Sequence, residues 1–248
     1  MTTPKRIAVV TGSNRGLGYA ISRKLSDIGV HVILTSRKEA EGLAAKQQLA
    51  NEGFDADYHL LDVTNDASVQ QFTEWLRETY GKVDILVNNA GVNPTPKPEE
   101  SSLLTVNLET MQTTFETNVL AVVRISQALI PLMKEQNYGR IVNISTEMAS
   151  LTAISTDYYP LAPSYRLSKI GVNGITVILA KELQDTNILV NAYSPGWMKT
   201  DMGGENAPFT AEEGAETAIY LATLPDGGAQ GKFFAEMRKF GGPVQVQW

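Results

Sequence analysis

Tyr165 and Lys169 are the pair of residues whose types and spacing suit proton transfer. They lie four positions apart in the segment YRLSK, and this spacing places both side chains on one face of a helix. A phenol with a pKa of about 10 is a weak acid or base at pH 7, but a cation held nearby favours the phenolate and lowers that pKa. The pair therefore suits general acid–base chemistry. Nine tyrosines and twelve lysines give about 0.4 such pairs by chance, so other features must support this interpretation.

A glycine-rich segment near the start of the chain, TGSNRGLG at 11–18, predicts a site for a phosphate group. It follows the apolar run 7–10 and contains Gly12, Gly16 and Gly18. A strand that ends in a glycine turn and opens a helix directs backbone N–H groups and the positive end of the helix dipole at a bound pyrophosphate. Because the spacing differs from G-x-G-x-x-G, a purely structural turn stays an alternative.

Two arginines indicate which dinucleotide the site would bind. Arg15 lies inside the glycine segment, and Arg37 follows Ser36 at the end of the second apolar run. In a doubly wound sheet an acidic residue about twenty positions after the glycines binds the ribose hydroxyls, whereas an arginine accommodates a 2′-phosphate. Ser36 cannot repel that phosphate, and Arg37 can pair with it in a bidentate manner. The sequence therefore predicts NADP(H) rather than NAD(H), with two solvated surface arginines as the alternative.

Apolar runs typical of strands alternate with amphipathic helical segments along nearly the whole chain. Strands are expected at 6–11, 30–35, 57–62, 83–88, 140–145, 189–194 and 231–234. Helices are expected at 17–28, 67–80, 111–133, 162–183 and 211–223. This alternation predicts an α/β Rossmann fold, a doubly wound, mostly seven-stranded parallel sheet with helices on both faces. Since no repeat, charge block or long linker divides the chain, residues 1–248 are expected to form a single dinucleotide-binding catalytic domain.

Three irregular segments interrupt this alternation, at 93–100, 147–163 and 197–208. Each follows a predicted strand, so each belongs at the carboxyl edge of the sheet, where doubly wound folds bind their ligands. They are expected to line a substrate site, with ordinary surface loops as the alternative.

Composition excludes several classes of function. The net charge of −6 argues against a broad nucleic-acid or anionic-membrane surface, so neither partner is expected. The absence of cysteine excludes disulfides, thiolate metal sites and cysteine nucleophiles. The two histidines, His31 and His59, lie in apolar strand-like runs, and no metal site is expected. No apolar run approaches the roughly 18 residues of a membrane helix, and a cytoplasmic location is expected.

Seven short motifs, in a fixed order along the chain, resemble those of the short-chain dehydrogenase/reductase family. They are TGSNRGLG (11–18), LDV (61–63), NNAG (88–91), TNVLA (117–121), NIST (143–146), YRLSK (165–169) and SPGWMKT (194–200). The resemblance covers essentially the whole chain. NIST, SPGWMKTDMGGENAP and the aromatic end from GKFF to Trp248 are most similar to carbonyl-reductase-type members.

The resemblance implies a role for each motif. Tyr165 would protonate the carbonyl oxygen of a substrate, Lys169 would bind the nicotinamide ribose, and Asn118 would hold a water that relays protons to Lys169. Positions 62–63 would flank the adenine, with a strand-end cap at Asp62 as the alternative, and 89–91 would line the ribose side, with a structural turn as the alternative. Positions 195–200 would close on the nicotinamide amide. The implied cofactor contacts are Gly12, Asn14, Arg15, Gly16, Leu17, Gly18, Ser36, Arg37, Asp62, Val63, Asn89, Ala90, Gly91, Tyr165, Lys169, Pro195, Gly196, Met198 and Thr200.

Two features depart from the family pattern. The usual catalytic hydroxyl belongs to the second serine of a Ser-Ser pair, which here reads Ser145-Thr146. We therefore assign the hydrogen bond to the developing oxyanion to Thr146, with Ser145 as the alternative. The nineteen positions from Thr146 to Tyr165 are more than in the commonest family members. The extra residues include DYYPL at 157–161, which forms either an aromatic wall for an apolar substrate or a surface bulge.

The expected function is the NADPH-dependent reduction of a small ketone or aldehyde to an alcohol. One alternative is a family enzyme dedicated to a single metabolite, such as a hydroxysteroid, a sugar or an acyl-thioester. Another is an NADPH-binding sensor or scaffold without turnover, against which the intact set of Asn118, Thr146, Tyr165 and Lys169 argues. Family members often form dimers or tetramers through their long helices, so a homo-oligomer is an expectation. The extra residues before Tyr165 could disturb such an interface, and the oligomeric state therefore stays open.

Overall fold

Runs of buried aliphatic residues form the strands of the sheet. In the computed structural model, which describes residues 5–95, 97–156 and 158–248, all four side chains of the first strand, IAVV, are buried. Such runs are typical of strands with helices on both faces. The strands of the described chain are β1 (Ile7–Val10), β2 (His31–Ser36), β3 (Ala56–Leu60), β4 (Ile85–Asn88), β5 (Gly139–Ile144), β6 (Ile188–Tyr193), β7 (Phe233–Phe234) and β8 (Gln245–Val246).

The strand order is β3-β2-β1-β4-β5-β6-β7-β8. Neighbouring strands are parallel except for the antiparallel pair β7–β8. The order reverses between β1 and β4, and in doubly wound sheets the ligand crevice lies outside the carboxyl ends of the strands at this point. The predicted α/β fold is confirmed, and β8 adds an antiparallel edge strand to the seven that were expected.

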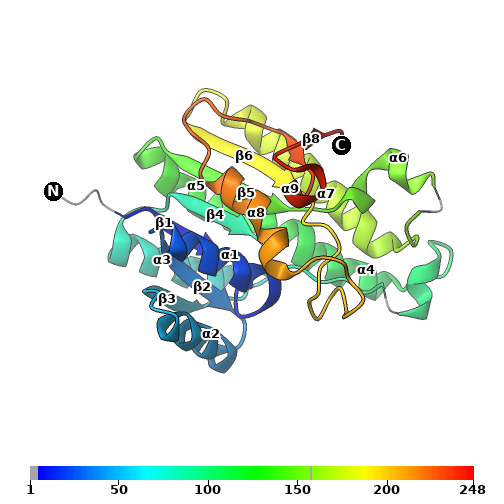
Figure 1. Ribbon diagram of the computed structural model, residues 1–248, viewed down its shortest axis with the longest axis horizontal. Coiled ribbons are helices and arrows are strands. Elements are labelled where there is room, and N and C mark those ends of the chain that lie inside the picture. Colours follow the sequence, from blue (N-terminus) through cyan, green and yellow to red (C-terminus); the bar gives the residue numbers. More distant parts are fainter. Residues whose placement is uncertain (1–4, 96, 157) are drawn as a thin grey trace.

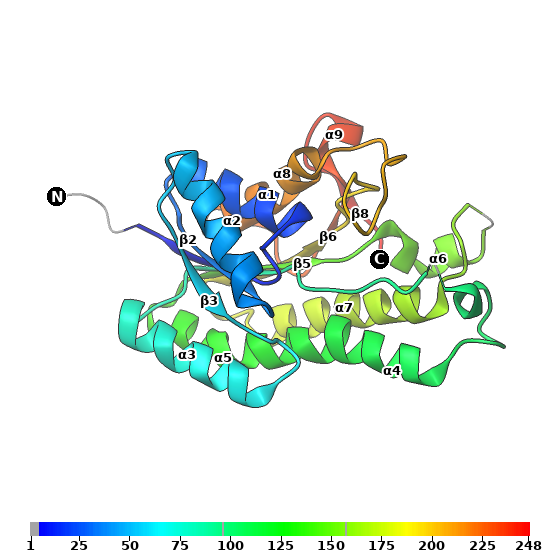
Figure 2. The same cartoon turned by 90° about the horizontal axis from the view of Figure 1, so that it is seen from below.

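Helices cover both faces of the sheet (Figures 1 and 2). One face carries α1 (Gly16–Asp27), α2 (Glu39–Asn51) and α8 (Ala211–Ala222), and the other carries α3 (Asp66–Tyr80), α4 (Leu108–Phe115), α5 (Ala121–Glu135) and α7 (Pro163–Glu182). Two short helices, α6 (Leu151–Ile154) and α9 (Met237–Phe240), lie in the connections after β5 and β7. A separate hydrophobic cluster fills each side of the sheet. No helix in the described ranges has the length and apolar character needed to cross a membrane.

The helices differ from the prediction in three respects. The short helices α6 and α9 were not expected. Helix α2 was not expected, because its buried residues are only Gly42, Ala45 and Leu49: they have helical spacing, but only Leu49 is a large apolar residue. Gly42 lies so close to β3 that a Cβ there would be 1.9 Å from Cε2 of Tyr58. The single helix expected at 111–133 is α4, a π-helical turn η2 (Glu116–Leu120) and α5 in succession.

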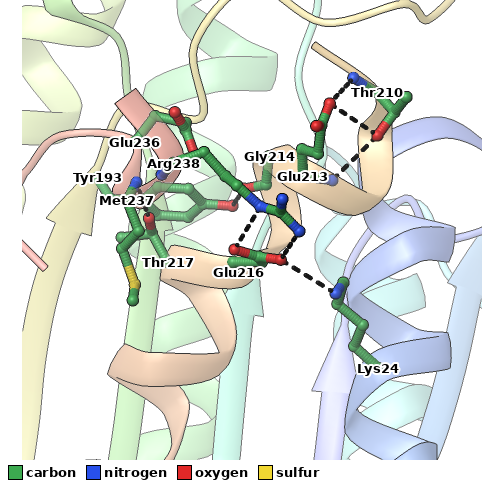
Figure 3. A network of polar contacts seen from close by, with 10 residues as sticks. All are labelled: Lys24, Tyr193, Thr210, Glu213, Gly214, Glu216, Thr217, Glu236, Met237 and Arg238. Atoms are coloured by element: carbon green, nitrogen blue, oxygen red, sulfur yellow. Dashed lines mark hydrogen bonds and ion pairs between the residues drawn. The ribbon is translucent and has the colours of Figure 1, made fainter. Parts of the chain in front are cut away.

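Helix α8 is fixed at its first turn by two sets of polar contacts (Figure 3). Thr210 and Glu213 form a capping box, in which each side chain bonds the backbone N–H of the other. The Tyr193 hydroxyl, at the end of β6, donates to the carbonyl oxygen of Gly214 at 3.0 Å. These contacts hold both ends of the β6–α8 connection, residues 195–210.

Replacing Thr210 by alanine removes the capping hydroxyl. We expect Thr210→Ala to lower the free energy of unfolding by about 1 kcal/mol in urea denaturation. Thr210→Ser keeps the oxygen and should stay close to the unaltered protein. An equal loss in both variants would mean that the threonine methyl group, rather than the cap, provides the stability.

Candidate active site

Three glycines make the turn after β1 a cradle of bare backbone. Gly12 and Gly16 adopt left-handed φ angles of 62° and 56°, which residues with a Cβ rarely adopt. A Cβ at Gly12 would lie 3.1 Å from Cα of Ala90, and one at Gly18 would lie 2.5 Å from Nδ2 of Asn89. The cradle opens at the N-terminus of α1, a geometry that suits a phosphate group.

The loop after β4 is bonded to this cradle. Thr11 Oγ1 accepts hydrogen bonds from the backbone N–H groups of Asn89 and Ala90, both at 3.0 Å. Asn89 Nδ2 donates to the carbonyl oxygens of Thr11 and Gly12 at 2.8 and 2.9 Å. The side chain of Asn89 is therefore engaged within the protein, and the role of residues 89–91 at the ribose side of a cofactor stays a prediction.

The two arginines expected at the 2′-phosphate both lie near Glu41, an acidic residue that the sequence analysis did not single out. Arg15 pairs with Asp201 (NH1 to Oδ2, 2.7 Å), whereas Arg37 is exposed at the end of β2. A hydrogen bond from Lys38, together with the charges of Arg15 and Arg37, holds the pKa of the Glu41 carboxyl below its ordinary value. The charges of both guanidinium groups therefore act on the same carboxyl group, that of Glu41.

Several predicted cofactor residues use their side chains within the protein. Ser36 Oγ is buried and donates to the carbonyl oxygen of Lys38 at 2.8 Å, Asn14 Nδ2 donates to Glu41 at 2.8 Å, and Leu17 packs into the core. The side chains of Ser36 and Leu17 thus support the fold. A ligand would meet their backbone.

Asp62 shapes the turn after β3. Its Oδ1 accepts from both N and Oγ1 of Thr64, at 2.9 and 2.7 Å. Burial acts to raise the pKa of Asp62, but the hydrogen bonds from Thr64 outweigh it and hold that pKa below its ordinary value. Val63 is buried in the core. A hollow of about 350 Å³ opens beside this turn, lined by Arg37, Thr64, Gln112, Thr113, Glu116 and Thr117.

Three hydrogen bonds, which we call the α7–β5 ladder, join helix α7 to the end of β5. They run from Lys169 Nζ to Ile144 O (2.8 Å), from Ser145 Oγ to Asn173 Oδ1 (2.6 Å) and from Asn143 Nδ2 to Thr176 Oγ1 (2.9 Å). The α7 residues are spaced by four and three positions, so they share one face of the helix. Tyr165 stands one turn before Lys169 on this face, at the carboxyl end of β5.

Burial dominates the protonation of Tyr165 and Lys169. Lys169 is buried, and its Nζ lies 5.9 Å from the centre of the Tyr165 ring. Burial raises the pKa of Tyr165 to about 12 and lowers the pKa of Lys169 to about 8. The lowered phenol pKa that we expected is not a property of the protein alone, since burial raises the pKa of Tyr165. Both groups therefore hold their protons at pH 7.

Asn118 lies in the π-helical turn η2, a kind of distortion that is frequent at functional sites. Its Nδ2 donates to Val92 O and to Ser168 Oγ, both at 2.9 Å, and its Oδ1 accepts from Val92 N at 2.8 Å. Ser168 Oγ in turn donates to the carbonyl oxygen of Tyr165. The side chain thus joins the β4 loop to α7, and both of its N–H groups are used, so the water-relay role stays a prediction.

The two candidate hydroxyls after β5 differ in their surroundings. Ser145 is buried and its hydroxyl is committed to Asn173. Thr146 is only half-buried, and its Oγ1 accepts a hydrogen bond from Met148 N at 3.2 Å. Because accepting leaves the hydroxyl hydrogen free, Thr146 retains a donor for a ligand.

The inserted segment before Tyr165 is held against the end of β5. Tyr159 donates a hydrogen bond to Glu147 at 3.0 Å, and its ring meets that of the exposed Tyr158 edge-on, with centres 4.7 Å apart. Asp157, at the start of the predicted wall, lies outside the described residues. Beneath Tyr159 the Arg166 side chain is 2% exposed, and its nitrogens have no hydrogen-bond partner among the described residues.

The connection after β6 approaches the glycine cradle. Gly196 has a left-handed φ of 77°, and Thr200 lies beside Gly16, where a Cβ would be 3.5 Å from its Cγ2. The Met198 side chain packs against α8, since a Cβ at Gly214 would lie 2.2 Å from its Sδ. Residues 195–200 therefore lie at the predicted edge, with Met198 turned into the core.

Glu100 is a second acidic residue that the sequence reasoning missed. It is buried after β4 and accepts from N and Oγ of Ser164, at 3.1 and 2.7 Å. This contact fixes the first turn of α7 immediately before Tyr165. A charged residue in a proline-rich loop carries no sequence signal of such burial.

Comparisons with known proteins agree with this geometry. Residues 6–210 match the family model described as short chain dehydrogenase. Carbonyl reductase [NADPH] 3 of Rattus norvegicus is 34% identical over 91% of this chain and 93% of its own. Carbonyl reductase [NADPH] 1 of Bos taurus is 34% identical over the full length of both chains. The structure of salutaridine reductase from Papaver somniferum superposes with a TM-score of 0.81 at 29% identity, covering 92% of this chain and 99% of that one.

The depressed pKa of Lys169 can be measured directly. We expect the Lys169 ammonium of the cofactor-free protein to titrate near pH 8 in NMR spectra of 13C-labelled lysine, with Lys169→Met assigning the signal. Because the folded pKa lies below the unfolded one, the cost of burying the charge is full below pH 8 and declines as the pH rises toward the unfolded pKa of about 10.4. A midpoint at that unfolded value would contradict the burial described above.

Proposed function

The chain belongs to the short-chain dehydrogenase family, and on that basis we propose that it uses NADPH to reduce ketones or aldehydes to alcohols, with Tyr165 as the general acid. The α7–β5 ladder is the main support. It holds Tyr165 and the Thr146 hydroxyl at the same sheet edge as the glycine cradle, where the strand order reverses. A proton donor and a second hydroxyl at such an edge suit the reduction of a carbonyl group.

The residues present fit a phosphorylated dinucleotide. A Cβ at Gly12 or Gly18 would meet Ala90 or Asn89, so the turn presents bare backbone to a phosphate group at the N-terminus of α1. Arg15 and Arg37 would hold the 2′-phosphate, and Lys169 the nicotinamide ribose. The NADPH in the names of the two carbonyl reductases supports the same cofactor. When bound, the reduced nicotinamide supplies a hydride to the carbonyl carbon.

The protonation states of the site favour reduction. With a pKa of about 12, the Tyr165 phenol carries its proton at pH 7 and can pass it to the carbonyl oxygen as negative charge develops there. The Thr146 hydroxyl donates a hydrogen bond to the same oxygen. Lys169, still mostly protonated at pH 7, stabilises the phenolate that remains.

Apolar side chains around the site support an apolar substrate. Tyr158, Trp197 and Met202 are exposed large side chains on the two segments that follow β5 and β6. Exposed apolar groups near a catalytic edge suit binding rather than solubility. We propose a small apolar carbonyl compound as substrate. An enzyme dedicated to one metabolite would instead reduce a single carbonyl compound among the several classes tested.

Consumption of NADPH measures the proposed reaction. We expect turnover of several aromatic ketones, α-dicarbonyls, quinones, aldehydes or steroid ketones with NADPH and little with NADH. Tyr165→Phe should lower kcat by about 10²- to 10⁴-fold while NADPH still binds, and Tyr220→Phe, the same change on the outer helix α8, should leave kcat unaltered. NADPH binding with no turnover on any carbonyl would instead indicate a sensor or scaffold.

Substitutions at Thr146 and Ser145 test which of the two hydroxyls donates a hydrogen bond to the substrate oxygen. Thr146→Val should lower kcat by about 10²- to 10³-fold, the usual cost of one oxyanion donor, and Thr146→Ser should retain most of the activity. Ser145→Ala should mainly lower the free energy of unfolding, by about 1–3 kcal/mol, because it leaves buried Asn173 without its donor. A larger loss of kcat in Ser145→Ala than in Thr146→Val would transfer the role to Ser145.

A further inference from the structure

The β6–α8 connection, residues 195–210, forms a flap with fixed ends. Its first end follows Tyr193, which is bonded to Gly214, and its second end is the capping box of Thr210 and Glu213 (Figure 3). Motion of the flap is therefore restricted to the segment between these anchors.

The flap is internally bonded and can move as one unit. Lys199 N donates to Phe209 O at 2.7 Å, and Phe209 N donates to Trp197 O at 3.3 Å. Trp197 Nε1 donates to Gly203 O at 2.7 Å. Displacement of its tip from the glycine cradle need not break these contacts.

One ion pair joins the tip of the flap to the cradle. Arg15 and Asp201 meet at 2.7 Å with side chains that are 69% and 73% exposed. Exposed pairs of this kind contribute little, because solvent screens them and both side chains lose freedom. A stronger anion can therefore replace Asp201 on Arg15.

We propose that Asp201 competes with the 2′-phosphate of the cofactor for Arg15, because it occupies, in the free protein, the guanidinium that this phosphate requires. This inference rests on the proposed function, which places that phosphate between Arg15 and Arg37. A phosphate dianion accepts bidentate hydrogen bonds and outcompetes a single exposed carboxylate, especially with a second arginine nearby. Binding of the phosphorylated adenosine end then releases the flap from the cradle, and an unphosphorylated nucleotide leaves the Arg15–Asp201 pair intact.

Adenosine fragments test the exchange without the nicotinamide. The probes are 2′,5′-ADP, which carries the 2′-phosphate, and 5′-AMP, which lacks it, with affinities measured by calorimetry. Asp201→Asn should tighten 2′,5′-ADP about two- to fivefold, the range of an exposed pair, and leave 5′-AMP unchanged. Glu205→Gln is the matched control, since it removes the same charge from an exposed position of the same flap that makes no ion pair within the described residues.

Trypsin cleavage after Lys199, an exposed residue of the flap, reports the release itself. We expect 2′,5′-ADP to accelerate this cleavage in the unaltered protein, 5′-AMP to have no effect, and Asp201→Asn to be cleaved rapidly without ligand. Mass spectrometry separates this cut from others.

Three outcomes would overturn the role of Asp201: equal tightening in Glu205→Gln, equal effects of both nucleotides, or weaker 2′,5′-ADP binding in Asp201→Asn. If the unaltered protein bound neither 2′,5′-ADP nor NADPH, the cofactor assignment would be refuted, and the role of Asp201 with it.

Discussion

The attachment of α7 to the end of β5 is the constraint on which the site depends. The α7–β5 ladder consists of buried polar groups, and each would cost about 1–3 kcal/mol if it lost its partner. The helix can therefore neither slide nor rotate by one residue without breaking all three contacts. Tyr165 inherits this register, and Asn118 extends it through Ser168 and Val92 to the loop after β4. A proton donor and a cofactor cradle on separate elements are thus held in one frame.

The glycine cradle and the α7–β5 ladder lie at the same edge of the sheet but depend on different physical features. The cradle depends on missing side chains, since a Cβ at Gly12 or Gly18 would meet its neighbours. The ladder depends on matched donors and acceptors, with Lys169 as its one charged member. Burial of each group shifts its own pKa, lowering that of Lys169 and raising that of Tyr165, so the same packing that fixes the geometry also sets the protonation states.

The fold class and the main site motifs could be predicted because they depend on local patterns. Apolar runs gave seven strands close to their observed positions, and the spacing of Tyr165 and Lys169 placed both on one helix face. Helix α2 escaped prediction because it packs through small residues against Tyr58. The contacts of Glu41, Glu100 and Asp201 join segments far apart in the sequence, and an acidic residue has the same appearance in a sequence whether it faces solvent or an arginine.

The two-residue strand β8 also limits how copies of the chain can associate. It pairs antiparallel with β7, and Trp248 beyond it stacks on Phe233 with ring centres 5.4 Å apart. A neighbouring molecule extends a sheet by bonding to a long row of free N–H and C=O groups on an edge strand. An edge of two residues offers a very short row. A continuous intermolecular sheet is therefore disfavoured at this side, and contacts between copies there must come from side chains.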